Sequence, residues 1–463
     1  MITRLASVAL AAVVLTNCSG STQSGGPTGA LPAAAMPAAG QPVGNYIKHL
    51  VIIVQENRSF DNVFYGFPGE DTPAFGNMLT SRDPHASVVK VRLRAVPFGK
   101  QDECHGYVCG LLDYDHGKMD GFGLPLLNPG EPAGRRPYTY LPRVQVAPYW
   151  AMAKQYVLAD RMFSTQFDAS FVAHLDLIAS TSSVASAASI VGLPTAVPWG
   201  CGAPVGTKTS LLRPGRLISN DGPFPCFTQF ATLADTLDAA GLTWKYYAPA
   251  AGTPGALWSI FQSIDRIYHG PEYEENVISP QTRVLQDAAA GNLPSVSWVV
   301  PDSADSDHAG ISTNRGPSWV ASVVNAIGTG PQWNSTAIVI LWDDWGGWYD
   351  HVVPPQRDFR GLGIRVPCII VSPYARKGYI SHTVYEFGSV LHFAEQAFNL
   401  PSLGPNRLGG APNDRGYTDV RGASFADAFD FTQKPRSFTP IPQPFPIDAF
   451  RNEKPSGVAP DDI

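Results

Sequence analysis

Four short apolar runs stand out in the pattern of hydrophobic and polar positions along the chain. They lie at 50–55 (LVIIVQ), 295–300 (SVSWVV), 337–342 (AIVILW) and 366–371 (VPCIIV). Runs of this length, rich in β-branched residues, are typical of strands buried on both faces of a parallel sheet. Segments that favour helix lie between them at 146–163, 227–241 and 318–328, and the last two end in a Gly suited to a helix C-cap. The alternation predicts an α/β fold with a central, mainly parallel sheet and helices on both faces.

Two of the predicted strands end in adjacent oxygen-bearing side chains. Glu56 and Asn57 follow the first run, and Asp343 and Asp344 follow the third. Ligands bind at the carboxyl ends of the strands of an open parallel sheet, so neighbouring strands would bring all four side chains into one pocket. Taken singly, each residue is more often only a turn former or helix N-cap. Their occurrence in pairs after two buried strands favours a common site.

Three carboxylates in one pocket repel each other strongly unless a cation lies between them. Carboxylate and amide oxygens are hard ligands that suit a divalent ion. The sequence therefore predicts one divalent metal ion, either Ca²⁺, Mg²⁺ or Mn²⁺, with Zn²⁺ as a further alternative.

A metal pocket of this kind hydrolyses phosphate esters through an activated water or through a side-chain nucleophile. Ser170 offers a hydroxyl in a predicted loop, followed by His174 and an apolar, helix-like run. Other hydroxyls lie nearby, at Ser164, at Thr165 and in the segment 180–183. The residues alone leave the choice among them open.

Several histidines fall in polar loops that the strand assignment places at the same edge of the sheet. They are His105, His308, His351 and His382. Imidazoles donate to phosphoryl oxygens, protonate a leaving alkoxide or bind a metal, although a lone loop histidine is more often structural. His116 is assigned a structural role.

Charge and the N-terminal pattern limit the partners and the location. Lys and Arg number 33 against 39 Asp and Glu, a net charge of −6, so bulk electrostatics give no indication of a nucleic-acid partner. Residues 1–18 have the layout of a secretory signal peptide, with Arg4 before an apolar stretch too short to span a bilayer. Cys18 either carries a lipid anchor, as in a bacterial lipoprotein, or is discarded or left free after cleavage. The protein is expected to be exported, to the periplasm or the exterior.

The rest of the chain divides into three parts. The uncharged segment 19–44, rich in Gly, Pro, Ala, Ser and Thr, is predicted to be a flexible linker. Residues 45–435 form the predicted catalytic domain, and 436–463 a proline-rich tail on the surface. Within the domain, 194–225 reads as an excursion loop held by a disulfide.

The cysteines indicate a disulfide-bonded protein, as export favours. The simplest local pairs are Cys104 with Cys109 and Cys201 with Cys226, which leaves Cys368 as a buried thiol in VPCIIV.

With these residues assembled, the chain resembles a bacterial phosphoesterase family of the alkaline phosphatase superfamily, which contains non-specific phospholipases C and a group of acid phosphatases. The resemblance covers 48–401. Its main anchors are HLVIIVQENRSFDNVFYG and LWDDWGGWYDHVVPP, the second similar to the family pattern YDENGGFFDHV. GKMDGF, SWVVPDSADSDHAG and VPCIIVSPYARKGYISHTVYEFGSVL give further support.

The resemblance implies an alkaline-phosphatase-like sandwich and a metal-dependent phosphoesterase acting on phosphate mono- or diesters, including phospholipids. The residues it implies as metal ligands are Glu56, Asn57, Asp343 and Asp344. It places Ser170 at the nucleophile position and His105 and His308 where histidines hold phosphate oxygens or assist the leaving group.

Three departures from the family pattern bear on these assignments. DASFVAH stands where the family commonly reads like GPTFPNH, which keeps the hydroxyl and His174 but loses the Pro-Asn. No histidine occurs in LTWKYYAP, so phosphate contacts are fewer or come from Tyr246 or Tyr247. Phe387 replaces a histidine of the related pattern YDHTS.

The sequence leaves two alternatives to a phosphoesterase. A sulfatase is disfavoured because its nucleophile motif C-x-P-x-R is absent. The non-enzymatic alternative is a secreted binding protein that kept the fold and metal site but lost the chemistry, as the altered DASFVAH loop would allow.

Overall fold

A computed structural model describes residues 42–99, 102–127, 130–310, 314–404 and 417–457. The predicted signal peptide, Cys18 and the linker up to residue 41 lie outside the described residues.

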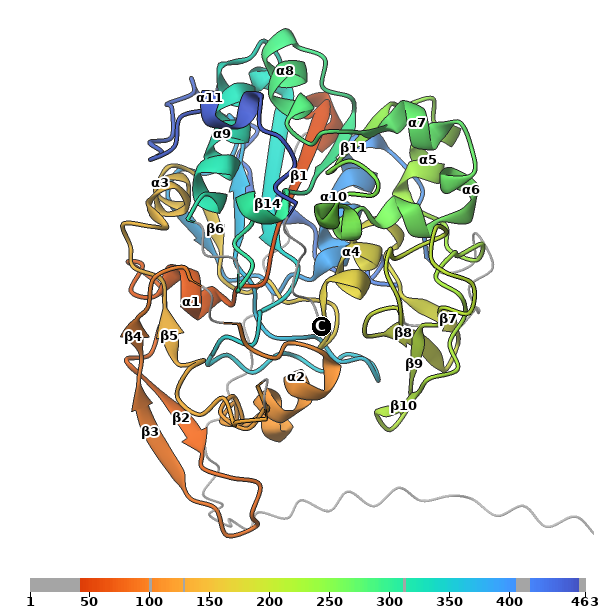
Figure 1. The fold of residues 1–463 in the computed structure, drawn as a ribbon. Coiled ribbons are helices and arrows are strands. Elements are labelled where there is room, and N and C mark those ends of the chain that lie inside the picture. The colour runs from red at the N-terminus through yellow and green to blue at the C-terminus, as the bar shows by residue number, and fades with distance from the viewer. Residues whose placement is uncertain (1–41, 100–101, 128–129, 311–313, 405–416, 458–463) are drawn as a thin grey trace, which may run out of the picture. The chain divides into compact units, whose positions relative to one another are not determined.

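An eight-stranded sheet forms the centre of the fold (Figure 1), with strand order β12-β11-β13-β1-β14-β15-β6-β16. The strands are β1 His49–Gln55, β6 Val157–Ala159, β11 Trp244–Tyr247, β12 Val277–Ile278, β13 Val296–Val299, β14 Thr336–Trp342, β15 Cys368–Val371 and β16 Tyr379–Ser381. Five of the seven pairings are parallel. The four apolar runs predicted as strands are therefore all strands, and the mainly parallel sheet is confirmed.

The strand direction differs from the prediction on one side of β14. β15 runs antiparallel to both β14 and β6, although VPCIIV was predicted as a parallel strand. The predicted helix 146–163 is also too long, since α3 ends at Gln155 and β6 follows at Val157. Backbone pairing of Val157–Ala159 with two strands outweighs continuation of the helix.

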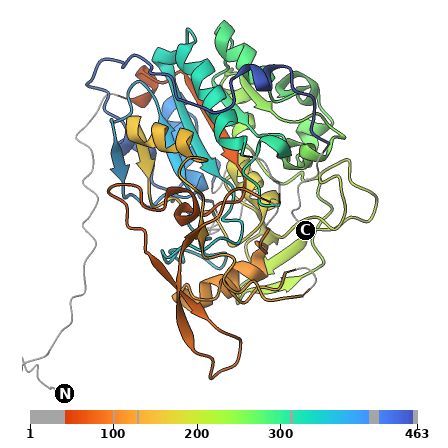
Figure 2. The same cartoon turned by 60° about the vertical axis from the view of Figure 1, so that its left-hand side comes forward.

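Helices cover both faces of the sheet (Figures 1 and 2). On one side lie α3 Ala147–Gln155, α8 Arg283–Ala290 and α9 Gly316–Thr329, and on the other α4 Ser170–Ala179 and α10 Phe387–Phe398. Of the predicted helix 227–241 only α5 Leu233–Ala239 forms, and Gly241 follows it with φ +67°. α9 continues one residue past Gly328, the predicted C-cap.

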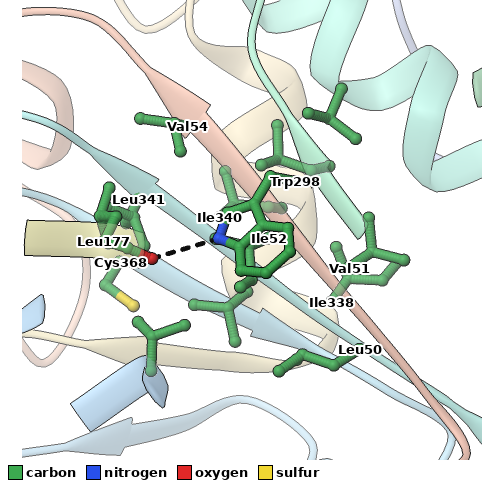
Figure 3. Close-up of a cluster of buried hydrophobic side chains, with 14 of the residues drawn as sticks. Leu50, Val51, Ile52, Val54, Leu177, Trp298, Ile338, Ile340, Leu341 and Cys368 are labelled. Carbon is green, nitrogen blue, oxygen red and sulfur yellow. Dashed lines mark hydrogen bonds between the residues drawn. The ribbon is translucent and has the colours of Figure 1, made fainter. Parts of the chain in front are cut away.

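The core between β1, β13, β14 and α4 fixes the strands that carry the site. Ile52, Trp298 and Ile340 are fully buried, and the Trp298 indole Nε1 donates to the Leu177 carbonyl of α4 at 3.2 Å (Figure 3). Burial of each large aliphatic side chain contributes about 1.5–3 kcal/mol. This packing sets the position of α4 relative to the ends of β1 and β14.

Smaller elements surround the central sheet. They are the antiparallel sheet β7 Ser183–Ala185, β8 Ala188–Val191, β9 Ser210–Arg213 and β10 Leu217–Ser219, the hairpin β2 Phe75–Leu79 with β3 Val88–Arg92, the pair β4 Arg94–Ala95 with β5 Thr139–Tyr140, and helices α1 Phe60–Phe64, α2 Tyr107–Tyr114, α6 Asp265–Tyr268, α7 Glu272–Asn276 and α11 Asp448–Arg451. The predicted excursion loop 194–225 thus contains two strands, β9 and β10. The described part of the C-terminal tail packs on α9, where Asn325 Nδ2 donates to the Ile441 carbonyl at 3.0 Å.

Both predicted disulfides are confirmed. Cys104 is bonded to Cys109 and Cys201 to Cys226, and Cys368 is a buried thiol on β15. No helix among the described residues has the length and apolar character needed to cross a bilayer.

Candidate active site

The ends of β1 and β14 meet at one edge of the sheet. The two strands are parallel neighbours with Gln55 opposite Trp342, so the residues that follow leave the sheet side by side. Asn57 turns into the left-handed region, with φ 57°, and its backbone N–H donates to Asp343 Oδ1 at 2.9 Å. The side chains of Glu56, Asn57, Asp343 and Asp344 are all fully buried. The structure therefore brings Glu56, Asn57 and Asp343 close together, whereas the Asp344 carboxylate accepts from the Gly346 N–H in the turn that follows.

A glycine turn after Asp344 makes this close approach feasible. Gly346 has φ +61°, and a Cβ at this position would lie 2.2 Å from the Asn57 carbonyl oxygen. Its N–H donates to Asp344 Oδ1 at 2.6 Å. Only glycine fits here without moving Asn57.

Ser170 and His174 reach the same carboxylates from α4. Ser170 is the first residue of the helix rather than part of the preceding loop, and His174 lies one turn later on the same face. Ser170 Oγ donates to Glu56 Oε2 at 3.3 Å, and His174 Nε2 lies 3.0 Å from Glu56 Oε1 and 3.9 Å from Asp343 Oδ2. The spacing of four residues was the available signal for His174, to which the sequence assigned no role.

His105 and His308 lie beside the carboxylates. His105 Nε2 accepts from Asn57 Nδ2 at 2.8 Å, while its Nδ1–H donates to the Glu103 carbonyl at 2.8 Å. The His308 ring lies 5.8 Å from the His105 ring, centroid to centroid, and its Nδ1 donates to the Ala309 carbonyl. Both histidines are buried, and His308 also stacks on Trp258.

The donor set fits a divalent cation. One ligand atom each from Glu56, His174 and Asp343 lies within 4.8 Å of the others. Within the described part of the chain, Asn57 Oδ1 and Asp343 Oδ2 are buried and accept no hydrogen bond. Buried oxygens of this kind are costly unless a donor or an ion faces them. The arrangement is therefore compatible with a metal held by carboxylate, amide and imidazole groups.

Asp168 anchors the turn that leads into Ser170. Its carboxylate accepts from the backbone N–H groups of Ala169 at 2.9 Å and Gly192 at 3.0 Å. Burial raises the pKa of Asp168 to about 6, against the lowering effect of these hydrogen bonds. The altered DASFVAH sequence thus still forms a fixed turn before the helix.

Other residues considered from the sequence make contacts elsewhere. The Tyr246 hydroxyl donates to the Trp258 carbonyl, and the Tyr247 hydroxyl donates to Asp287. His351 pairs with Asp61 at 2.8 Å, and His382 with Asp160 at 2.6 Å. Phe387 is buried as the first residue of α10, and His116 is exposed.

The model of the Phosphoesterase family matches residues 47–401. The chain belongs to the Phosphoesterase family. This confirms the resemblance carried by the sequence motifs, and it makes the protein a hydrolase of phosphate ester bonds.

Curated relatives align along most of the chain. Phospholipase C A of Mycobacterium tuberculosis is 26% identical over 452 residues, which cover 85% of this chain and 79% of that protein. Non-hemolytic phospholipase C of Pseudomonas aeruginosa is 25% identical over 454 residues, 84% of this chain and 61% of that protein.

Among solved structures, a protein of the alkaline phosphatase superfamily from Vibrio parahaemolyticus covers 76% of this chain and 66% of its own. Its identity is 11% and the TM-score 0.33, so it bears on neither substrate nor mechanism.

Proposed function

We propose that this phosphoesterase cleaves phosphate mono- or diesters with Ser170 as the nucleophile, in a site that binds one divalent metal ion. The ligands would be Glu56, Asn57, Asp343 and Asp344, joined by His174. The observation that carries the proposal is the contact of Ser170 Oγ with Glu56 Oε2, inside a buried group of metal-ligating side chains.

The chain's own groups account for attack by Ser170. Glu56 Oε2 lies where it accepts the hydrogen of the hydroxyl, so it orients Oγ and can hold the proton as Oγ attacks phosphorus. Oγ stands at the N-terminus of α4, where backbone N–H groups and the helix dipole favour an anionic phosphoryl group. When bound, a divalent ion would offset the carboxylate charge and polarise the hydroxyl and phosphoryl oxygens.

His105 and His308 have the placement needed for charge and proton transfer. Their rings are close enough for both to contact the oxygens of one phosphoryl group. Nδ1 of each ring donates to a backbone carbonyl, so Nε2 is the nitrogen that would face the phosphoryl group. When Nε2 of His105 is protonated, it exchanges its bond from Asn57 Nδ2 for one to a phosphoryl oxygen, and a protonated imidazole donates its proton to the leaving alkoxide.

The second half of the reaction regenerates the Ser170 hydroxyl. Cleavage of the ester P–O bond releases the alcohol and leaves phosphorus bonded to Ser170 Oγ. A water molecule attacks this intermediate and gives a proton to the imidazole that protonated the leaving alkoxide. The Ser170–phosphorus bond breaks, and Oγ takes back its proton from Glu56, which restores the hydroxyl.

The relatives and the N-terminal sequence support the substrate class and the location. Relatives named phospholipases C favour phospholipids among the esters. Export is supported by the apolar segment that follows Arg4 and by two disulfides, which persist in oxidising compartments. Lipidation of Cys18 would tether the enzyme to a membrane.

The test compares p-nitrophenyl phosphate with p-nitrophenylphosphorylcholine, with and without EDTA and added divalent metals. Wild type should turn over at least one ester in a metal-dependent manner, and Ser170→Ala should lose most of this turnover. Ser164→Ala is the matched control, because Ser164 is an equally buried hydroxyl that donates to the Gln166 carbonyl. Retained turnover in Ser170→Ala would argue for direct attack by water. A wild type that binds metal but cleaves neither ester would favour the binding protein.

A further inference from the structure

We propose that the disulfide Cys104–Cys109 is a positioning element of the active site, which holds His105 against Asn57. His105 directly follows Cys104, and the bonded Cys109 belongs to α2. The inference rests on the proposed function, because it takes His105 to contact the phosphoryl group.

Cys109 belongs to α2, which packs both on the segment before Ser170 and on the segment after Asp344. A Cβ added to Gly110 of α2 would lie 2.8 Å from Phe167 Cβ and 2.9 Å from Trp345 Cη2, so the helix backbone packs directly on both rings. The Trp345 indole Nε1 donates to Asp113 of α2 at 3.0 Å. Phe167 precedes the turn into Ser170, and Trp345 follows Asp344. Cys109 is therefore held by the same packing that positions the catalytic groups.

The near end of the disulfide sets the position of the imidazole. His105 bonds back to the Glu103 carbonyl through Nδ1 and forward to Asn57 through Nε2. A Cβ on Gly347 would lie 2.8 Å from the Cys104 carbonyl oxygen, so this backbone also rests on the turn after Asp344. A shift of the chain at Cys104 therefore moves the ring relative to the phosphoryl site.

The contacts of Arg136 with this segment are weaker than a covalent bond. Arg136 donates to Glu103 at 3.1 Å and to the Asp102 carbonyl at 3.0 Å, but its side chain is 41% exposed. Ion pairs with an exposed partner restrain little. The disulfide adds a covalent restraint to these contacts and fixes where Cys104 and His105 lie.

Loop length separates this role from simple stabilisation. Cys104 and Cys109 are 5 residues apart, whereas Cys201 and Cys226 are 25 apart. A short closed loop removes less entropy from the unfolded chain than a long one. If the disulfides only stabilise the fold, loss of Cys201–Cys226 should lower Tm and activity more. If Cys104–Cys109 positions His105, its loss should lower kcat more.

The experiment uses two matched double variants, Cys104→Ser/Cys109→Ser and Cys201→Ser/Cys226→Ser. The first should lower kcat by about tenfold to hundredfold, as expected for a misplaced catalytic group, with metal content unchanged. The second should lower Tm more but leave kcat within about twofold of wild type. In a His105→Ala background, the Cys104→Ser/Cys109→Ser change should cost almost nothing further, because both act through one group.

Three results would overturn the proposal. They are an unchanged kcat in Cys104→Ser/Cys109→Ser, an equal loss in the control, and a loss that adds fully to that of His105→Ala. A second readout needs no turnover: the imidazole NMR signals assigned by their absence in His105→Ala should shift in the first variant and not in the second. Unshifted signals would likewise overturn it. If the wild type cleaves no ester but the His105 signals still shift in Cys104→Ser/Cys109→Ser, the proposed function is refuted and the positioning role remains.

Discussion

Replacing Arg365 by Met should destabilise the protein strongly, and more at alkaline than at acidic pH. Arg365 is buried between the segments that follow β1 and β14. Its Nη2 donates to Asp61 at 2.8 Å and its Nε to Asp350 at 3.0 Å, while Nη1 donates to the Asp160 carbonyl at 3.0 Å. The guanidinium also lies 4.2 Å from the centroid of the Phe60 ring. It neutralises two carboxylates that are themselves fully buried.

The size of the effect follows from what the substitution leaves behind. Met retains most of the apolar packing, but Asp350 loses the guanidinium and Asp61 is left with His351 at 2.8 Å. Breaking a buried ion pair from one side costs about 3–5 kcal/mol. Burial raises the pKa of Asp350 to about 6, with Arg365 lowering and Asp61 raising it. Because Asp350 is easier to protonate in the folded than in the unfolded state, its contribution to stability is present at acidic pH and lost as pH rises through about 6.

Loss of Arg365 should raise this pKa further, and each added unit is worth about 1.4 kcal/mol. The deficit in unfolding free energy of Arg365→Met should therefore be larger at alkaline pH than at acidic pH. Urea unfolding of wild type and variant at both pH values measures it. Arg451→Met is the control, since Arg451 pairs with Asp448 at 2.8 Å on the surface and its loss should cost under about 1 kcal/mol. A deficit below about 1 kcal/mol at alkaline pH, or one that grows towards acid, would refute the reasoning.

Three further predictions concern the site and its support. Asp343→Asn should lower metal affinity at least tenfold in calorimetric titration while the fold is retained, because one charged ligand is lost; unchanged affinity would remove Asp343 from the ligand set. Gly346→Ala should lower both Tm and kcat, since the added Cβ would lie 2.2 Å from the Asn57 carbonyl; a variant equal to wild type in both would contradict this packing. Ile340→Ala should cost about 2–5 kcal/mol in urea unfolding, with metal content per folded molecule unchanged; a parallel loss of metal would show that the core and the site are coupled.

The centre of the fold could be predicted because its strands are buried on both faces. β1, β13 and β14 read as continuous apolar runs, which is the pattern a buried strand requires. The direction of β15 could not be read in this way, since an antiparallel strand buried between two others has the same composition. β6 was missed because its three residues continue the apolar character of α3 without a Gly or Pro between them.

The part of the site that lies at the ends of the strands could be predicted from the sequence. Glu56 and Asp343 meet because β1 and β14 are neighbours in register, which paired acidic ends suggested. The contact of His174 with Glu56 depends on how α4 packs across the sheet, a tertiary feature set in part by the bond from Trp298 to Leu177. The role of Arg365 gave no signal, because Asp61 and Asp160 lie far away in the sequence and Asp350 lies in a separate loop segment.

The stereochemical course at phosphorus distinguishes attack by Ser170 from direct attack by water. The substrate would be an isotopically chiral phosphate ester, cleaved by the metal-loaded enzyme with transfer to an acceptor alcohol. Attack by Ser170 followed by attack of the acceptor involves two in-line displacements, each with inversion, so the account predicts net retention of configuration. Net inversion would show a single displacement without a bond to Ser170, and would contradict it.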